Sequence, residues 1–292
     1  MDVRHFFTAS RILIVAGKGG TGKSTVSAAL ALAAAHAGLR TRLVDLEGAV
    51  VEVPDHDLLS RETVSPGRAL SDYLDSHGLG FVSRRLATTG IVELVASTAP
   101  GIDDLLVLGK VKSLANSPDL DLVVVDGPAS GHALDMLRAP THLRRAVPGG
   151  PIGHQADEVI EMLADSSRCR TMIVTTPAVT PVHEALEAAH QLADEFSVAL
   201  APVAVNMVDE APPAVDDATS LPTHLRDAWT WATTRAHSQA GAVAELDAAL
   251  AAHLHVARML LRRHRLDGVE LIEALSDDLA AEIERLPESG AT

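Results

Sequence analysis

A glycine-rich loop near the start of the numbering carries the clearest chemical signal in the chain. Residues 17–25 read GKGGTGKST and fit the pattern G-x-x-x-x-G-K-[ST]. In that pattern the glycines let backbone N–H groups turn inward around a phosphate, the lysine adds positive charge at the β- and γ-phosphates, and the hydroxyl binds Mg²⁺. We therefore expect a phosphate site formed by Gly17, Gly19, Gly20, Thr21, Gly22, Lys23, Ser24 and Thr25.

A second lysine, Lys18, directly follows the first glycine of this loop. A second cation is useful in phosphoryl transfer, because negative charge builds up on the β–γ bridging oxygen and on the γ-phosphate. Lys18 is therefore a candidate catalytic residue beside Lys23. The alternative is an exposed loop lysine without a chemical role.

A carboxylate that can complete a metal site follows a distant apolar run. Residues 122–125 read LVVV and are followed by Asp126. A carboxylate at the end of such a strand can hold the hydration shell of Mg²⁺ opposite the hydroxyl of Ser24. We therefore expect Ser24 and Asp126 to be the metal-binding residues.

A phosphate-binding loop needs a strand before it and a helix after it, and the sequence indicates both. Residues 11–16 form a short apolar run, and the alanine-rich stretch 24–37 predicts a helix that ends before Gly38. Further apolar strands are expected at 41–46, 120–125, 169–175 and 202–208. Because fully apolar strands that alternate with helices indicate a parallel sheet covered on both faces, we expect an α/β fold. It would be a three-layer P-loop NTPase with a mostly parallel central sheet and additional helical segments.

The other segments are expected to be mostly helical. Expected helices include 101–115, a helix from 131 that Pro140 limits, and a helix from Thr180, as N-cap, to 196. We expect one P-loop domain over residues 1–292. Its parts are a nucleotide-binding core at about 11–48 and 120–210, a helical segment at about 50–118 that includes 69–74 and 81–86, and a C-terminal helical region at about 222–288.

The composition excludes several classes of function. Acidic residues number 39 and basic residues 24, which gives a net charge of −15. Such a chain is a poor candidate for binding nucleic acid, because phosphate backbones need a basic face. The one cysteine, Cys169, excludes a disulfide framework and favours a cytoplasmic protein. The sequence indicates neither a signal peptide nor a transmembrane segment.

The loop with its extra lysine resembles the deviant phosphate-binding loop, K-G-G-x-G-K-[ST], of a branch of P-loop ATPases. That branch includes MinD, ParA, the nitrogenase iron protein and the arsenical-pump ATPases. In it the signature lysine reaches across a dimer to the nucleotide of the other subunit. The resemblance implies this role for Lys18.

A second segment is similar to the arsenical-pump and tail-anchored-protein-targeting ATPases, whose switch II reads D-T-A-P-T-G-H. Residues 126–132 read DGPASGH. Asp126, Gly131 and His132 match this motif and Ser130 is a conservative change, whereas residues 127–129 depart from it. The resemblance implies an ATPase that uses ATP and Mg²⁺ and converts nucleotide state into the opening and closing of a dimer.

Two further site residues are assigned by the same resemblance. Glu47 stands where a second carboxylate of MinD- and ParA-like relatives orients the attacking water, so Glu47 is a candidate catalytic residue. Asn206 ends the run PVAVN, where the family has an asparagine that contacts the adenine ring. An asparagine amide both donates and accepts, as a base edge requires. Residues 206–209 also fit the guanine motif N-K-x-D except for its lysine, which leaves GTP open.

The family's specialised features are absent from this sequence. It has no metalloid-binding or zinc-binding pair of cysteines, one phosphate-binding loop rather than two, and no Met-rich helices for a hydrophobic client. The expected protein is a homodimer, or a heterodimer with a paralogous ATPase, that serves an unidentified protein or membrane-protein client. Two alternatives are a weakly hydrolysing scaffold within such a heterodimer and a MinD/ParA-type positioning ATPase. Acidic residues in 270–286 disfavour the latter, because anionic lipid or DNA would repel them.

Overall fold

A seven-stranded sheet forms the centre of the computed structural model, which describes residues 1–46, 48, 51–76, 101–215 and 218–287. Every pairing between the described strands is parallel, and their order is β3-β2-β4-β1-β5-β6-β7. The strands are β1 (Ile12–Gly17), β2 (Thr41–Asp45), β3 (Leu59–Thr63), β4 (Leu122–Ala129), β5 (Cys169–Thr175), β6 (Val203–Val208) and β7 (Arg258–Arg262). The predicted α/β fold is confirmed, and the strand before the phosphate loop lies between β4 and β5.

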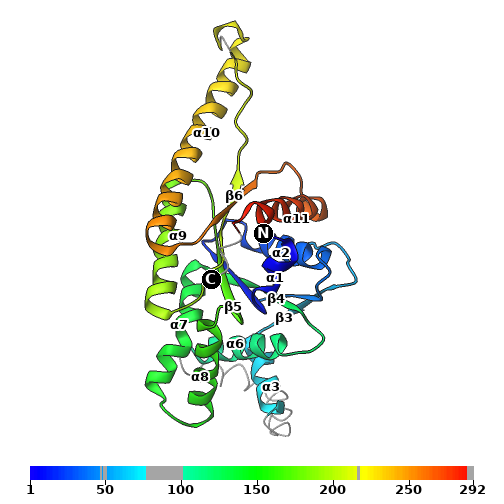
Figure 1. Ribbon diagram of the computed structural model, residues 1–292, viewed down its shortest axis with the longest axis vertical. Coiled ribbons are helices and arrows are strands. Elements are labelled where there is room, and N and C mark those ends of the chain that lie inside the picture. Colours follow the sequence, from blue (N-terminus) through cyan, green and yellow to red (C-terminus); the bar gives the residue numbers. More distant parts are fainter. Residues whose placement is uncertain (47, 49–50, 77–100, 216–217, 288–292) are drawn as a thin grey trace.

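Helices cover both faces of this sheet (Figure 1). One face carries α1 (Val3–Thr8), α2 (Lys23–His36) and α11 (Gly268–Arg285). The other carries α3 (Pro66–Ser76), α6 (Ile102–Ala115), α7 (Ser130–Ala146), α8 (Gly150–Ala164) and α9 (Val179–His190). Along β1, Leu13 and Val15 pack with the first group and Ile12 and Ile14 with the second, as the two-residue repeat of a strand requires. None of the described helices is both long and apolar enough to cross a bilayer.

The alanine-rich helix α2 is almost wholly enclosed, because it lies between the sheet and α11. Its central residues, such as Leu30 and Ala31, have no exposed surface. Small side chains let a helix approach two neighbours closely, so alanine suits this middle position. The helix starts and ends within a residue of its predicted bounds, which fixes the distance from the phosphate loop to the core.

A long helix, α10 (Thr223–Ala249), extends well beyond the sheet, and the chain after β6 runs out alongside it (Figure 1). Near its outer part the indole Nε1 of Trp229 donates a hydrogen bond to the carbonyl of Pro213, 2.9 Å away. Trp231 is 65% exposed. The inner part of α10 packs on β6 and α9 through residues such as Leu246.

Two strands lie where the sequence predicted helix, so the helical assignments of 50–118 and 222–288 were wrong in part. β3 pairs with β2, and β7 pairs with β6, at the two edges of the sheet. At β7, Glu282 of α11 accepts a hydrogen bond from the backbone N–H of Leu260 (2.8 Å), and Asp278 accepts one from that of Arg262 (3.3 Å). Helix carboxylates thus satisfy strand N–H groups at an edge that would otherwise be available for pairing. Such partners are distant in sequence, so local periodicity does not indicate the strand.

Two boundaries also differ from prediction. Pro140 does not end α7, which continues to Ala146 because buried Leu137 and Leu143 anchor the helix on both sides of the proline. The helix expected to begin at Thr180 starts at Val179, with Ala178 as N-cap. The helix predicted at 81–86 lies outside the described residues.

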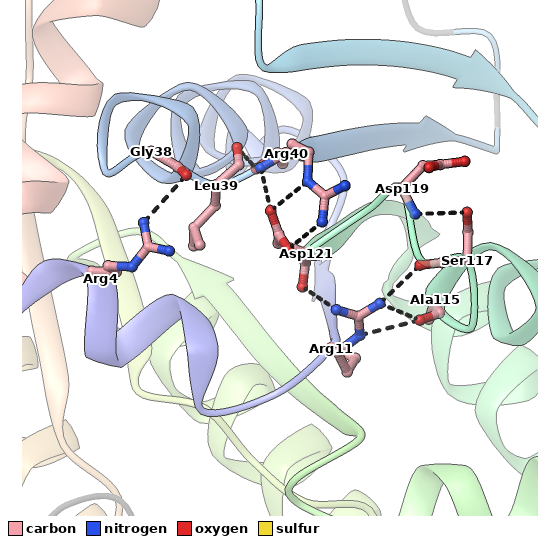
Figure 2. Close-up of polar contacts among 10 residues, drawn as sticks. Arg4, Arg11, Gly38, Leu39, Arg40, Ala115, Ser117, Asp119 and Asp121 are labelled. Carbon is pink, nitrogen blue, oxygen red and sulfur yellow. Dashed lines mark hydrogen bonds and ion pairs between the residues drawn. The ribbon is translucent and has the colours of Figure 1, made fainter.

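A polar network lies at the amino-terminal ends of the central strands, on the side opposite the phosphate loop (Figure 2). Arg40 donates two side-chain hydrogen bonds of 3.0 and 2.8 Å to the carboxylate of Asp121, and its backbone N–H donates a third of 2.9 Å. Arg11 donates to the carbonyls of Asp121 (3.2 Å) and Ala115 (2.8 Å). The hydrogen bonds from Arg40 lower the pKa of Asp121 to about 2. The network joins β2, β4 and α6 where their connecting loops enter the sheet.

Exchange of Asp121 for Asn should destabilise the protein near neutral pH. A carboxyl whose folded pKa lies below its unfolded value of 3.8 stabilises the fold above that value, and this stabilisation is lost as the pH falls towards 2. Urea midpoints for Asp121→Asn should therefore lie below those of the wild type at pH 7 and converge with them between about pH 4 and pH 2. Asp119→Asn, two residues away, is the control. A constant difference across that range would contradict the assignment.

Candidate functional site

The loop between β1 and α2 has the backbone form of a phosphate cradle. The hydroxyl of Thr21 donates to the carbonyl of Lys18 (2.8 Å), which closes the turn. Gly22 has a φ of +86° and a Cβ there would lie 2.4 Å from the side-chain nitrogen of Asn206, so no other residue fits. Lys23 and Ser24 then open α2, whose positive N-terminal end faces the loop.

Asn206, within β6, holds this loop in place through its side-chain amide. Its amide nitrogen donates to the carbonyl of Thr21 (2.9 Å), and its amide oxygen accepts from the N–H of Met207 (2.9 Å). The side chain is only 4% exposed. The sequence offered no sign of this bracing contact, because the two residues lie 185 positions apart. Recognition of a base by Asn206 remains a prediction.

Two buried carboxylates lie side by side next to the loop. Asp45 and Asp126 are in register on the paired strands β2 and β4, and they are 3% and 7% exposed. The hydroxyl of Ser27 donates to Asp126 (3.1 Å), and Arg61 of β3 donates to Asp45 (3.2 Å). Sequence reasoning assigned neither Asp45 nor Ser27 to the site. The sequence D-L-E at 45–47 offered a signal for Asp45, because relatives carry D-x-D there.

Burial raises the pKa of Asp126 above its ordinary value. Hydrogen bonds from Ser24 and Ser27 and the positive charge of Lys23 oppose that shift, while the neighbouring Asp45 adds to it. The side chains of Lys23, Ser24 and Asp126 are therefore near neighbours, as the sequence predicted. A buried carboxylate with a raised pKa attracts a cation, because a bound cation offsets the cost of its charge.

The donor set fits Mg²⁺. Ser24 offers a hydroxyl and Asp126 a carboxylate, and such hard oxygen donors, completed by nucleotide phosphates, are the usual environment of this ion. Among the described residues there is no cluster of three or more His, Cys, Asp or Glu side chains that could hold a metal ion.

Lys18 lies at the surface of the loop, with its side chain 51% exposed. Its amine forms an ion pair with Glu184 of α9 in the same chain. Glu47 lies outside the described residues; the backbone N–H of its neighbour Gly48 donates to Asp45 (2.8 Å). His132 is exposed at the start of α7.

A cavity of ≈ 460 Å³ opens beside Met207 and is lined by Thr176, Pro177, Ala178, Met207, Trp231, Thr234, Arg235, Ser238, Gln239 and Arg263. Asp209, at the guanine-motif position, is engaged beside it. It accepts hydrogen bonds from Arg235 and Gln239 (2.8 Å for the latter) and pairs with Arg263 (2.7 Å). Burial alone would raise the pKa of Asp209, but these partners lower it.

Comparison with known proteins gives the following matches. The profile of the family described as CobQ/CobB/MinD/ParA nucleotide binding domain matches residues 12–288. ATPase BagA of Mycobacterium tuberculosis is 34% identical over 224 residues, which cover 67% of this chain and 64% of BagA. A putative arsenical pump-driving ATPase of Halobacterium salinarum is 28% identical over 229 residues, covering 68% of this chain and 35% of that protein. ATPase GET3B of Arabidopsis thaliana is 26% identical over 174 residues, covering 48% and 42%.

These matches confirm the resemblance to arsenical-pump ATPases that residues 17–25 and 126–132 indicated. The chain spans less than two thirds of the length of the mycobacterial relative.

Exchange of Asp126 for Asn should stabilise the protein in the absence of nucleotide. A carboxyl whose folded pKa exceeds its unfolded value costs stability once the pH rises above the unfolded value, and costs none below it. We expect the Tm of Asp126→Asn to exceed that of the wild type at pH 7, and the difference to shrink as the pH falls towards about 4. Calorimetry measures this, with exposed Asp227→Asn as control. A variant that melts below the wild type at pH 7 would refute this reading of the charge.

Proposed function

The chain belongs to the CobQ/CobB/MinD/ParA nucleotide-binding-domain family, and from this premise we propose that it binds ATP with Mg²⁺ and hydrolyses it. The observation that carries the proposal is the juxtaposition of Lys23, Ser24 and Asp126 at the mouth of the loop. The names of its relatives, ATPase BagA and arsenical pump-driving ATPase, support an ATPase over other nucleotide-binding functions.

Each residue of the cradle has a distinct task in this proposal. The loop N–H groups and Lys23 bind the β- and γ-phosphates, while Ser24 and Asp126 hold the metal. Bound Mg²⁺ would neutralise charge that develops on the phosphates. Asp45, paired with Arg61, keeps a second negative charge next to Asp126. Asn206 holds the carbonyl of Thr21 and so fixes the loop that contacts the phosphates.

The partners of Asp209 disfavour guanine as the base. In the guanine motif an aspartate must accept hydrogen bonds from the base. Asp209 instead accepts them from Arg235 and Gln239 and pairs with Arg263, and a guanine would have to displace these partners. The amide of Asn206 is itself engaged by Thr21 and Met207, so the choice of ATP is supported by the names of the related ATPases.

We propose that two subunits close on nucleotide and that Lys18 of each reaches the nucleotide of the other. The second subunit is either a copy of this chain or a paralogous ATPase. Half of the Lys18 side chain is exposed, which supports contact with a partner. The dimer would then act in the cytoplasm on a protein or membrane-protein client whose identity is open.

The alternative, a weakly hydrolysing scaffold, rests on three positions at which this sequence departs from the family's motifs: Glu47, Gly48 and Gly127. Packing accounts for one of these departures. A Cβ at Gly127 would lie 2.5 Å from the carbonyl oxygen of Val15, because β4 and β1 approach closely where their register shifts. We therefore favour hydrolysis, with Glu47 orienting the attacking water.

Removal of the phosphate ligands should weaken nucleotide binding. Lys23→Ala and Ser24→Ala should each weaken MgATP affinity about 10- to 100-fold, the usual effect of losing a charge-assisted hydrogen bond. Titration calorimetry measures this, with Lys112→Ala of the ion pair to Glu158 as control. GTP should bind more weakly than ATP to the wild type. Unchanged MgATP affinity in both variants would remove the proposed function.

Glu47→Gln separates an enzyme from a scaffold. Loss of a residue that orients the attacking water should lower turnover about 100-fold or more while MgATP affinity is retained. Steady-state phosphate release by the purified chain measures this, with Glu52→Gln as control. If phosphate release requires an added paralogue and is the same with Glu47→Gln as with the wild-type chain, the scaffold alternative is correct.

A further inference from the structure

The ion pair between Lys18 and Glu184 joins the phosphate loop to a helix 166 residues further along the chain. Glu184 uses one carboxylate oxygen for this contact. The other, Oε2, is shielded from solvent and has no hydrogen-bond partner in the described part of the chain. Among the described residues, the amine of Lys18 is therefore the polar partner of this carboxylate.

The pair lies where the phosphate loop, α7 and α9 meet. A small cavity of ≈ 20 Å³ beneath it is lined by Thr21 of the loop, by Ala133 and Leu137 of α7, and by Glu184 and Ala185 of α9. Helix α7 follows directly on β4, which carries Asp126. Residues of α7 therefore line the same cavity as Glu184 and Lys18.

This contact conflicts with the role proposed for Lys18. An amine held by a carboxylate of its own subunit cannot at the same time bind the phosphates of a partner subunit. The lysine must exchange one anion for another when the dimer closes. The exchange is feasible because both side chains are partly exposed, at 51% and 37%, and an exposed ion pair shifts an equilibrium only about fivefold or less.

We propose that Glu184 is a positioning residue that pairs with Lys18 in the separated subunit. When the dimer closes, this ion pair breaks and Lys18 binds the nucleotide of the other subunit. The inference rests on the proposed function, since it requires Lys18 to act across a dimer. Glu184 thereby keeps the lysine ordered and close to the dimer face, yet opposes closure until nucleotide offers a stronger anion.

Glu184→Gln tests this inference because it removes the charge and keeps the size of the side chain. In MgATP the protein concentration that gives half-maximal turnover should fall about two- to fivefold, the worth of an exposed ion pair. The turnover at saturating protein should stay unchanged, since the closed dimer no longer uses the contact. Glu187→Gln, one turn further along α9 and exposed, is the matched control and should behave as the wild type.

A second readout needs no dimer. The amine of Lys18 in the separated wild-type subunit, followed by mass spectrometry, should react faster with an amine-directed reagent as ionic strength rises, because salt screens an exposed pair. In Glu184→Gln the reaction should already be fast and insensitive to salt. Thermal unfolding of each variant checks that it folds, and Glu184→Asp should retain part of the restraint.

The outcomes distinguish the inference from its premise. If wild-type turnover depends on protein concentration and is lost in Lys18→Ala, but Glu184→Gln matches Glu187→Gln in both readouts, the inference alone is wrong. A Glu184→Gln protein that is folded but has lost turnover at saturating protein also overturns it, because Glu184 would then serve catalysis directly. If Lys18→Ala is as active as the wild type, the proposed action across a dimer fails, and the inference fails with it.

Discussion

The in-register parallel pairing of β1, β4 and β2 is the constraint on which the candidate site depends. This pairing sets Asp45 directly beside Asp126 and carries the end of β1 to the same edge of the sheet. The carboxyl-terminal ends of parallel strands all lie on the same side of the sheet. Residues far apart in the chain therefore come together there even though they do not contact one another. Helix α2 then begins at that edge, and its enclosed position between sheet and α11 keeps its N-terminus aimed at the loop.

The site concentrates charge in a place where charge is costly. Asp45 and Asp126 are buried next to each other, and Lys23, Arg61, two serine hydroxyls and the backbone N–H of Gly48 offset their charge. Without a bound ligand, an apolar or amide side chain at position 126 would make the fold more stable. The carboxylate is retained at a cost in stability, a trade that proteins make where a ligand supplies the missing charge.

Away from the site, several carboxylates of this acidic chain form ion pairs within the chain. The small basic run at 262–265 begins at the last residue of the edge strand β7. Arg262 and His264 both pair with Asp278, and Arg263 pairs with Asp209. Asp278 at the same time accepts from the backbone of β7. Asp278 of α11 therefore both protects the sheet edge and pairs with two residues of the run.

The sequence by itself determined the loop at 17–25, its flanking strand and helix, the apolar strands of the sheet interior and the carboxylate at Asp126. These features depend on residues close together in the chain, where spacing and side-chain type impose the local geometry. Only the tertiary structure decided that 59–63 and 258–262 are edge strands, that Asn206 braces Thr21, that Asp45 faces Asp126 and that Lys18 is held by Glu184. Each of these depends on partners brought together by strand order and helix packing, and no local pattern encodes a contact between residues that meet only after the sheet has formed.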